Sequence, residues 1–137
     1  MGFRDPKNFI DRELSWLAFN KRVLEEALDP KTPLLERVKF AGIVATNLDE
    51  FFMIRVSGVQ EQMRSDVRRK SISGQTPGEQ FQLVHAEAHK QFNALYKCWR
   101  DAILPELDKA KVQVAHPRDL SRKLRKELRE RLAREAR

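Results

Sequence analysis

The sequence predicts an all-α fold, a small antiparallel helical bundle with a charged C-terminal helix. Apolar residues recur at spacings of three and four along most of the chain, and alternating β-branched runs are few. Prolines and capping residues stand where helices would begin and end. The 137 residues suffice for one domain with a hydrophobic core.

The first helix should span residues 12–28. Asp11 is a suitable N-cap, and Pro30 would end the helix soon after residue 28. Apolar residues cover well over half of the perimeter, so we expect this helix to be sandwiched between neighbours. A second helix should begin near Pro33.

Residues 47–55 join a polar, acidic tetrad to four consecutive large apolar residues, and Arg55 ends the segment. A single helical stripe buries residues three or four apart, so this run should be covered on more than one side or meet something beyond the chain. Asn47 and Glu50 have the spacing of a capping box, which predicts a kink or a new helix start at Asn47. The helix that begins there should reach about Arg69.

Residues 70–78 are rich in Ser, Gly and Pro and should form a loop. Thr76 and Glu79 have capping-box spacing around a proline, so we expect the next helix to begin there and to end near Ile103. Beyond it lies a connector in which residues 112–114 have the pattern of a short strand. The last predicted helix carries leucines four residues apart, namely Leu120, Leu124, Leu128 and Leu132.

The net charge of +7 is concentrated at the end of the chain. Residues 118–137 contain nine Lys or Arg and four Asp or Glu, a charge of +5, and residues 1–117 contain 18 and 16, a charge of +2. A nucleic-acid-binding module more often carries its basic patch on the folded body, with aromatic residues interleaved for stacking. We therefore expect no nucleic-acid partner. The alternative is a bundle that binds nucleic acid through its basic tail, with an affinity that falls steeply with salt.

The single cysteine, Cys98, excludes an internal disulfide and fits a reducing compartment. No apolar run approaches the roughly 20 residues that span a bilayer. These features predict a cytoplasmic protein.

The residue patterns of most enzyme sites are absent. The five glycines form neither a P-loop nor a dinucleotide-binding motif, and no Ser, His and Asp set has credible catalytic spacing. His85 and His89 would share a helix face, but no carboxylate or cysteine at matching spacing completes a metal site. We expect these to be half-buried packing histidines, and we expect no metal ligand and no catalytic residue.

Arg55 follows two phenylalanines by three and four residues, which places it on or beside the apolar face of a helix. A guanidinium there needs an acidic partner or an anionic ligand. Two interpretations are open: an internal ion pair with Glu13 or Asp49, and contact with an external phosphate.

Two segments together resemble a known family. They are RELSWLAFN at residues 12–20 with RVLEEA at residues 22–27, and PLLERVKF at residues 33–40 leading into NLDEFF at residues 47–52. In order and spacing both resemble the N-terminal domain of the bacterial polyphosphate kinases that work through a phosphohistidine. The likeness is specific over about residues 9–60 and looser beyond.

The resemblance implies that residues 1–106 are the helical N-terminal domain, and that residues 107–137 are a connector and the start of the following head domain. The complete enzyme would be several times longer and would transfer the γ-phosphate of ATP onto polyphosphate, with Mg²⁺, through a phosphorylated histidine. That histidine and the phosphate-binding arginines would lie in later domains. None of the three histidines here takes that role, so this chain alone would be inactive and would bind no cofactor.

The resemblance also implies partners. ATP would be bound with the help of this domain, polyphosphate through later domains, and the remaining domains of the same chain would pack on this one. The full-length enzyme would be a homo-oligomer, cytoplasmic, and able to associate with the membrane.

The residue that the resemblance assigns to the nucleotide is Asn47, in a domain that covers the adenine side of the ATP site. An asparagine amide offers both a donor and an acceptor, which match an adenine edge. This role competes with the helix cap inferred above, because one amide cannot serve both fully. A scaffold or dimerisation module without ligand contact is the alternative from another class of protein.

Overall fold

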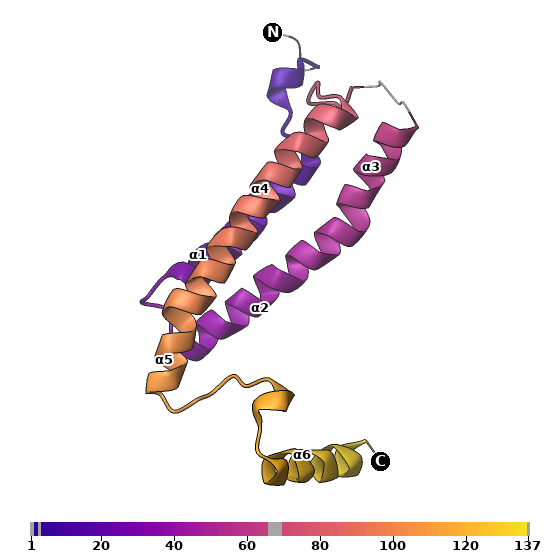
Figure 1. Cartoon of the computed structure of the whole chain (residues 1–137). Helices are drawn as coiled ribbons and strands as arrows, with labels where there is room; N and C mark the ends of the chain where they lie inside the picture. Colours follow the sequence, from indigo (N-terminus) through magenta and orange to yellow (C-terminus); the bar gives the residue numbers. More distant parts are fainter. Residues whose placement is uncertain (1, 3, 66–69, 137) are drawn as a thin grey trace. The chain divides into compact units, whose positions relative to one another are not determined.

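The computed structural model describes residues 2, 4–65 and 70–136, and the chain divides into two compact units, Met1–Glu106 and Leu107–Arg137. Every regular element in the described residues is helical, which confirms the predicted all-α class (Figure 1). The prediction of a short strand at residues 112–114 was wrong. These residues form no regular structure, since the described part of the chain contains no strand that could complete a ladder with them.

Helix α1 spans Arg12–Leu28, as the sequence predicted. The Asp11 carboxylate accepts hydrogen bonds from the backbone N–H groups of Glu13 and Leu14, both at 2.9 Å, and so satisfies two donors of the first turn. The helix is not sandwiched between neighbours within this unit as expected, since Phe19 on its outer face remains 59% exposed. The helix instead buries one stripe at helical spacing, made of Leu17, Asn20, Leu24 and Ala27.

Helix α2 spans Leu34–Phe51 and passes through Asn47 without a break. The predicted kink and capping box at Asn47 were therefore wrong, since an N-cap residue precedes the first helical turn, whereas Asn47 has helical turns before it as well as after it. The helix changes pitch later, in the π-helical segment Phe52–Val56, and continues as α3, Ser57–Arg64. The predicted extension to Arg69 lies outside the described residues.

The π-helical turn explains how the chain accommodates four large apolar residues in a row. Phe51 and Val56 are both buried and lie five residues apart, the spacing that a π turn brings onto one face. Phe52 is half-buried, whereas Met53 is 70% and Ile54 is 64% exposed. Within this unit the run is therefore covered on one side only, and its second half is an exposed apolar surface.

Helix α4 spans Pro77–Cys98 and begins with the predicted capping box. The Thr76 hydroxyl accepts a hydrogen bond from the Glu79 N–H at 3.2 Å, and the Glu79 carboxylate accepts one from the Thr76 N–H at 2.9 Å. Pro77 at the first position costs nothing, because its missing N–H would have no partner inside the helix.

The sequence predicts a helix end near Ile103. In the structure the helical path instead continues beyond Pro105. A π-helical segment, Trp99–Ile103, leads into α5, Leu104–Lys109. In it the Leu104 N–H bonds the Trp99 carbonyl five residues back, so the hydrogen-bond ladder has already shifted when the chain reaches the proline. This wider turn accommodates a residue that has no N–H to donate.

The unit Met1–Glu106 is a bundle of three rods: α1, α2 continued by α3, and α4 (Figure 1). Successive rods run in opposite directions, and α1, α2 and α4 all contact one another. None of the described helices has the length and hydropathy needed to cross a membrane. The core between the rods includes Leu17, Leu24, Val44, Leu48, Phe51, Val84, Ala88 and Leu95.

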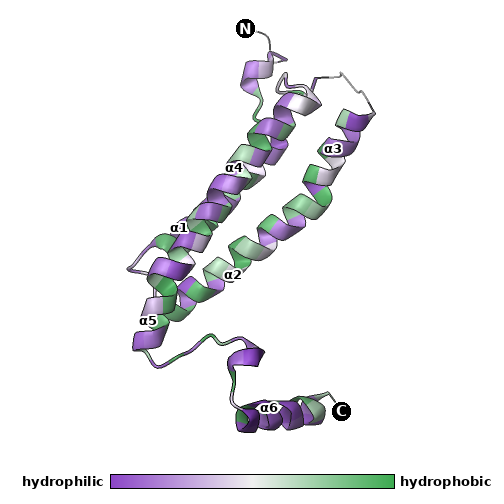
Figure 2. Ribbon diagram, in the orientation of Figure 1, coloured by the Kyte–Doolittle hydropathy of each residue, from purple (hydrophilic) through white to green (hydrophobic). Residues whose placement is uncertain are grey.

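In the unit Leu107–Arg137, helix α6 spans Arg122–Glu135, and the Ser121 hydroxyl caps it by accepting from the Leu124 N–H. Figure 2 shows α6 as a mostly hydrophilic helix. The ion pair between Arg131 and Glu135, at 3.0 Å, is one of its local contacts. Three residues of its leucine row are exposed: Leu124, Leu128 and Leu132.

We expect Leu17→Ala to destabilise the bundle by about 2–5 kcal/mol, because Leu17 is fully buried between the rods and its loss leaves a cavity. Leu35→Ala is the matched control, since Leu35 is 65% exposed and its loss should cost less than about 0.5 kcal/mol. Urea unfolding of the 137-residue chain measures both. Equal effects of the two substitutions would contradict the described core.

Candidate functional site

A row of three amide side chains crosses the bundle and ends at Asn47. Asn47 Nδ2 on α2 donates to Asn20 Oδ1 on α1 at 3.0 Å, and Asn20 Nδ2 donates to Gln91 Oε1 on α4 at 3.1 Å. Asn20 is 0% exposed and Gln91 is 2% exposed. Buried polar groups are stable only when paired, so this row links the three helices at one level of the core.

The row begins at two acceptors beside Gln91. Gln91 Nε2 donates to the backbone carbonyl of Leu17 at 2.8 Å and to Glu87 Oε1 at 3.1 Å. The first acceptor belongs to α1 and the second to α4, one turn before Gln91. Both ends of the Gln91 amide are therefore engaged.

Asn47 is the end of the row that reaches the surface. Its side chain is half-buried, and among the described residues its Oδ1 accepts no hydrogen bond. The competition between cap and ligand contact therefore disappears: Asn47 caps no helix, and one N–H goes to Asn20. The carbonyl oxygen and the second N–H are left for an external group.

The surroundings of Asn47 are partly apolar and open. Ile43 lies one helical turn earlier on the same face and is 45% exposed. Asn47 lines neither of two hollows of this unit, which have volumes of about 320 Å³ and 630 Å³. Its half-buried side chain lies outside both of them, on the surface of α2.

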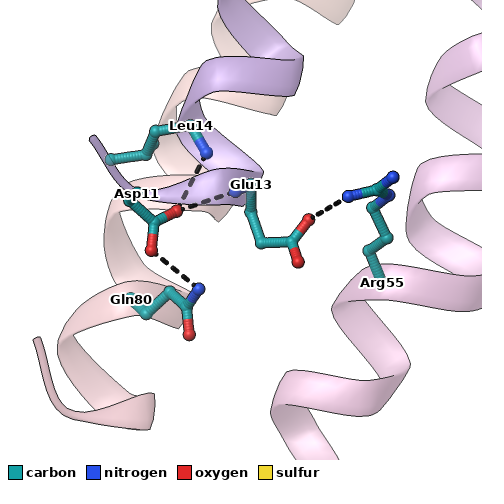
Figure 3. Close-up of polar contacts among 5 residues, drawn as sticks. All are labelled: Asp11, Glu13, Leu14, Arg55 and Gln80. Atoms are coloured by element: carbon teal, nitrogen blue, oxygen red, sulfur yellow. Dashed lines mark hydrogen bonds and ion pairs between the residues drawn. The ribbon is translucent and has the colours of Figure 1, made fainter. Parts of the chain in front are cut away.

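Arg55 is engaged inside the unit. Its Nη1 lies 2.9 Å from Glu13 Oε2 (Figure 3). Its guanidinium also lies 5.8 Å from the ring centre of Trp16. Of the two partners considered from the sequence, the structure places Glu13 against Arg55, and within the described residues no hydrogen bond or ion pair joins Arg55 to Asp49. This geometry leaves less of the guanidinium for an external phosphate.

The same end of α1 is tied to α4. Asp11 Oδ2 accepts a hydrogen bond from Gln80 Nε2 at 2.9 Å, while Asp11 Oδ1 caps α1 (Figure 3). Asp11 is 6% exposed, so both carboxylate oxygens are satisfied in a buried position.

The other end of α1 is held by a buried arginine that the sequence did not single out. Arg37 Nε donates to the Ala27 carbonyl at 2.9 Å, and its Nη2 lies 3.7 Å from Cys98 Sγ. A cation at a helix C-terminus complements the helix dipole. Cys98 is buried and donates to the same carbonyl at 3.5 Å, so it is a packed thiol.

The two histidines of α4 contact each other and two phenylalanines through their rings. The ring centres of His85 and His89 are 4.3 Å apart, with Phe81 beside His85 and Phe52 beside His89. Both imidazoles are exposed rather than half-buried as predicted. In the described part of the chain, no group of three or more His, Cys, Asp or Glu residues is arranged to hold a metal ion.

Sequence reasoning singled out Asn47 and Arg55 but not Asn20 and Gln91. A signal for both exists: each is a carboxamide at a core position of an apolar stripe. Asn20 lies between Leu17 and Leu24, and Gln91 follows Ala88 by three residues. Two polar residues in the core of separate helices are expected to pair.

Fold and site together define a helical-bundle domain that presents one oriented amide on an open face. Comparison with known proteins places it in a family. A family profile described as "Polyphosphate kinase N-terminal domain" matches residues 9–115. The chain therefore belongs to this family. No solved structure matches the chain.

Several curated relatives carry the name polyphosphate kinase. "Polyphosphate kinase 1" of Chlorobaculum tepidum is 47% identical over 120 residues, which cover 87% of this chain and 17% of the relative. The protein from Synechocystis sp. is 54% identical over 82 residues, 60% of this chain and 11% of the relative. The polyphosphate kinase of Streptomyces coelicolor is 42% identical over 123 residues, which cover 89% of this chain and 16% of the relative. The chain thus spans less than a fifth of these relatives.

We expect the Glu13–Arg55 pair to contribute a coupling energy of about 1 kcal/mol, because its side chains are only 16% and 28% exposed. A double-mutant cycle of Glu13→Gln and Arg55→Met, followed by urea unfolding, measures it. The Glu36–Lys39 pair, with side chains 49% and 69% exposed, is the control and should couple by less than about 0.3 kcal/mol. Indistinguishable coupling in the two pairs would show that burial does not strengthen the first.

Proposed function

We propose that this domain forms the adenine-side wall of the ATP site of a polyphosphate kinase, with Asn47 in contact with the base. The complete enzyme would transfer the terminal phosphate of ATP onto polyphosphate, and both would be its substrates. The observation that carries the proposal is the carbonyl oxygen of Asn47, an acceptor that has no partner among the described residues and is held at the surface by a buried neighbour, Asn20.

The chemistry of Asn47 supports a base contact. A carboxamide with one engaged N–H still offers an acceptor and a donor, the pair that an adenine edge complements. The exposed side chain of Ile43, one turn away on the same face, adds apolar surface of the kind that purine rings pack against. Because Asn47 lies within a helix, its position is better defined than a loop residue would be.

The rest of the ATP molecule would be held elsewhere. Arg55 is paired with Glu13, which leaves the wall without an obvious clamp for a triphosphate. The described residues do not fit a magnesium site, since they contain no cluster of three or more candidate ligands, and we derive no step through Mg²⁺. The phosphates would therefore be bound by other domains of the same chain.

The exposed apolar residues support packing against those domains. Phe19, Leu35, Met53 and Ile54 are each more than half exposed. Scattered apolar side chains are normal on a surface, but Met53 and Ile54 are adjacent and belong to the π-helical segment that turns them outward. We propose that residues 107–137 connect this domain to the next one.

We expect Asn47→Ala in the complete enzyme to raise the KM for ATP by about five- to tenfold and to leave kcat within about twofold, because a hydrogen bond to the base contributes equally before and during phosphate transfer. Steady-state kinetics with ATP as the varied substrate measures the effect. Asn93→Ala is the control, since Asn93 is an exposed asparagine within α4. An unchanged KM in Asn47→Ala would favour a scaffold domain without ligand contact.

We expect the 137-residue chain alone to bind ATP with a Kd of about 1 mM or weaker, equivalent to about 4 kcal/mol or less, because one wall without a phosphate clamp supplies few contacts. Isothermal titration of ATP into the chain measures this affinity. Micromolar binding would mean that the chain holds the phosphates itself.

A further inference from the structure

We propose that Asn20 and Gln91 are positioning residues that fix the direction of the Asn47 amide, so that the site favours a 6-amino purine over a 6-oxo purine. This inference rests on the proposed contact between Asn47 and the base. It adds a determinant of base specificity that lies in the core, away from the nucleotide.

The direction is set at the Gln91 end of the row. A backbone carbonyl can only accept a hydrogen bond, so the Leu17 carbonyl, 2.8 Å away, requires the NH₂ end of the Gln91 amide. The carboxylate oxygen of Glu87, at 3.1 Å, makes the same demand. A reversed Gln91 amide would place its oxygen against two acceptors, so this amide has one favourable orientation.

Each amide passes the direction to the next. Because Gln91 turns Oε1 toward Asn20, Asn20 must present Nδ2 there, at 3.1 Å. The Oδ1 of Asn20 then faces Asn47, which must present its own Nδ2, at 3.0 Å. Asn20 and Gln91 are almost completely buried, so no bulk water replaces a lost partner if one amide turns over.

The consequence appears at the surface. With one Nδ2 hydrogen held by Asn20, the amide of Asn47 presents an acceptor, Oδ1, and a donor, its second Nδ2 hydrogen, in a fixed order; neither has a partner among the described residues. The edge of adenine matches this order, because its 6-amino group donates to Oδ1 and its ring N1 accepts from Nδ2, whereas inosine reverses both groups and turns its 6-oxo acceptor toward Oδ1. An unrestrained asparagine would rotate its amide to suit either base. Here that rotation would place Asn47 Oδ1 against Asn20 Oδ1, and two acceptors cannot form a hydrogen bond with each other.

The test compares ATP with inosine triphosphate, which differs from ATP in carrying the 6-oxo group. The kcat/KM of the complete enzyme is measured with each nucleotide for the wild type, Asn47→Ala, Gln91→Met and Asn20→Leu. The ratio of the two constants does not depend on the fraction of folded enzyme, so a loss of stability alone leaves it unchanged. The control is Gln82→Met, the same substitution at an exposed position of α4.

We expect Gln91→Met and Asn20→Leu to lower the ATP preference by about tenfold, the factor that one misdirected hydrogen bond produces, and to bring it near that of Asn47→Ala. The change should appear in the KM for ATP, with kcat within about twofold, and Gln82→Met should keep the wild-type ratio. If Asn47→Ala lowers the ratio while Gln91→Met and Asn20→Leu do not, the positioning role is overturned and the proposed function stands. If Asn47→Ala itself changes neither KM nor ratio, both fail.

A second measurement serves if the core variants do not fold. In the wild-type 137-residue chain, one of the two Asn47 Nδ2 hydrogens should exchange with solvent at least about tenfold more slowly than those of exposed Asn93, because it is bonded to Asn20. Nuclear magnetic resonance of the side-chain amides measures this. Equally fast exchange of both Asn47 hydrogens would overturn the inference.

Discussion

The row of hydrogen bonds from the Leu17 carbonyl through Gln91 and Asn20 to Asn47 is the constraint on which the rest of the bundle depends. Apolar contact is non-directional, and a core of leucine and valine side chains tolerates small shifts of one helix along another. A buried amide does not, because a displaced partner leaves a donor or an acceptor unpaired at a cost of about 1–3 kcal/mol. One row of amides in the core therefore sets the register of α1, α2 and α4 together.

Contacts at the two ends of α1 reinforce that register. Asp11 joins its first turn to Gln80 of α4, and Glu13 joins it to Arg55 in the π-helical segment. Arg37 binds the Ala27 carbonyl in its last turn. With α1 tied at the beginning, middle and end, the helices carry Asn47 on a rigid frame, which is what a wall of a binding site requires.

Much of the fold was predictable because helix ends depend on residues close in sequence. The caps Asp11 and Thr76 act on N–H groups two or three residues away, and the structure forms both as predicted. The capping box predicted at Asn47 does not form, although the residues have the right spacing. The free-energy cost of interrupting α2 cannot be judged from the neighbouring residues in the sequence. Of the candidate site, the sequence indicated only the surface residue, Asn47. Asn20 and Gln91 lie 71 residues apart in sequence, and only the fold brings them together.

The sequence by itself determined the helical class, the bounds of α1, the capped start of α4 and, through its motifs, the family. These depend on local periodicity, on caps, and on residue order. Only the tertiary structure decided that Asn47 is a hydrogen-bonded residue inside a helix, that Arg55 pairs with Glu13, and that Met53 and Ile54 face outward. Each of these depends on which distant side chains reach a given atom, and on where a π turn shifts the face of a helix, which spacing along one segment does not specify.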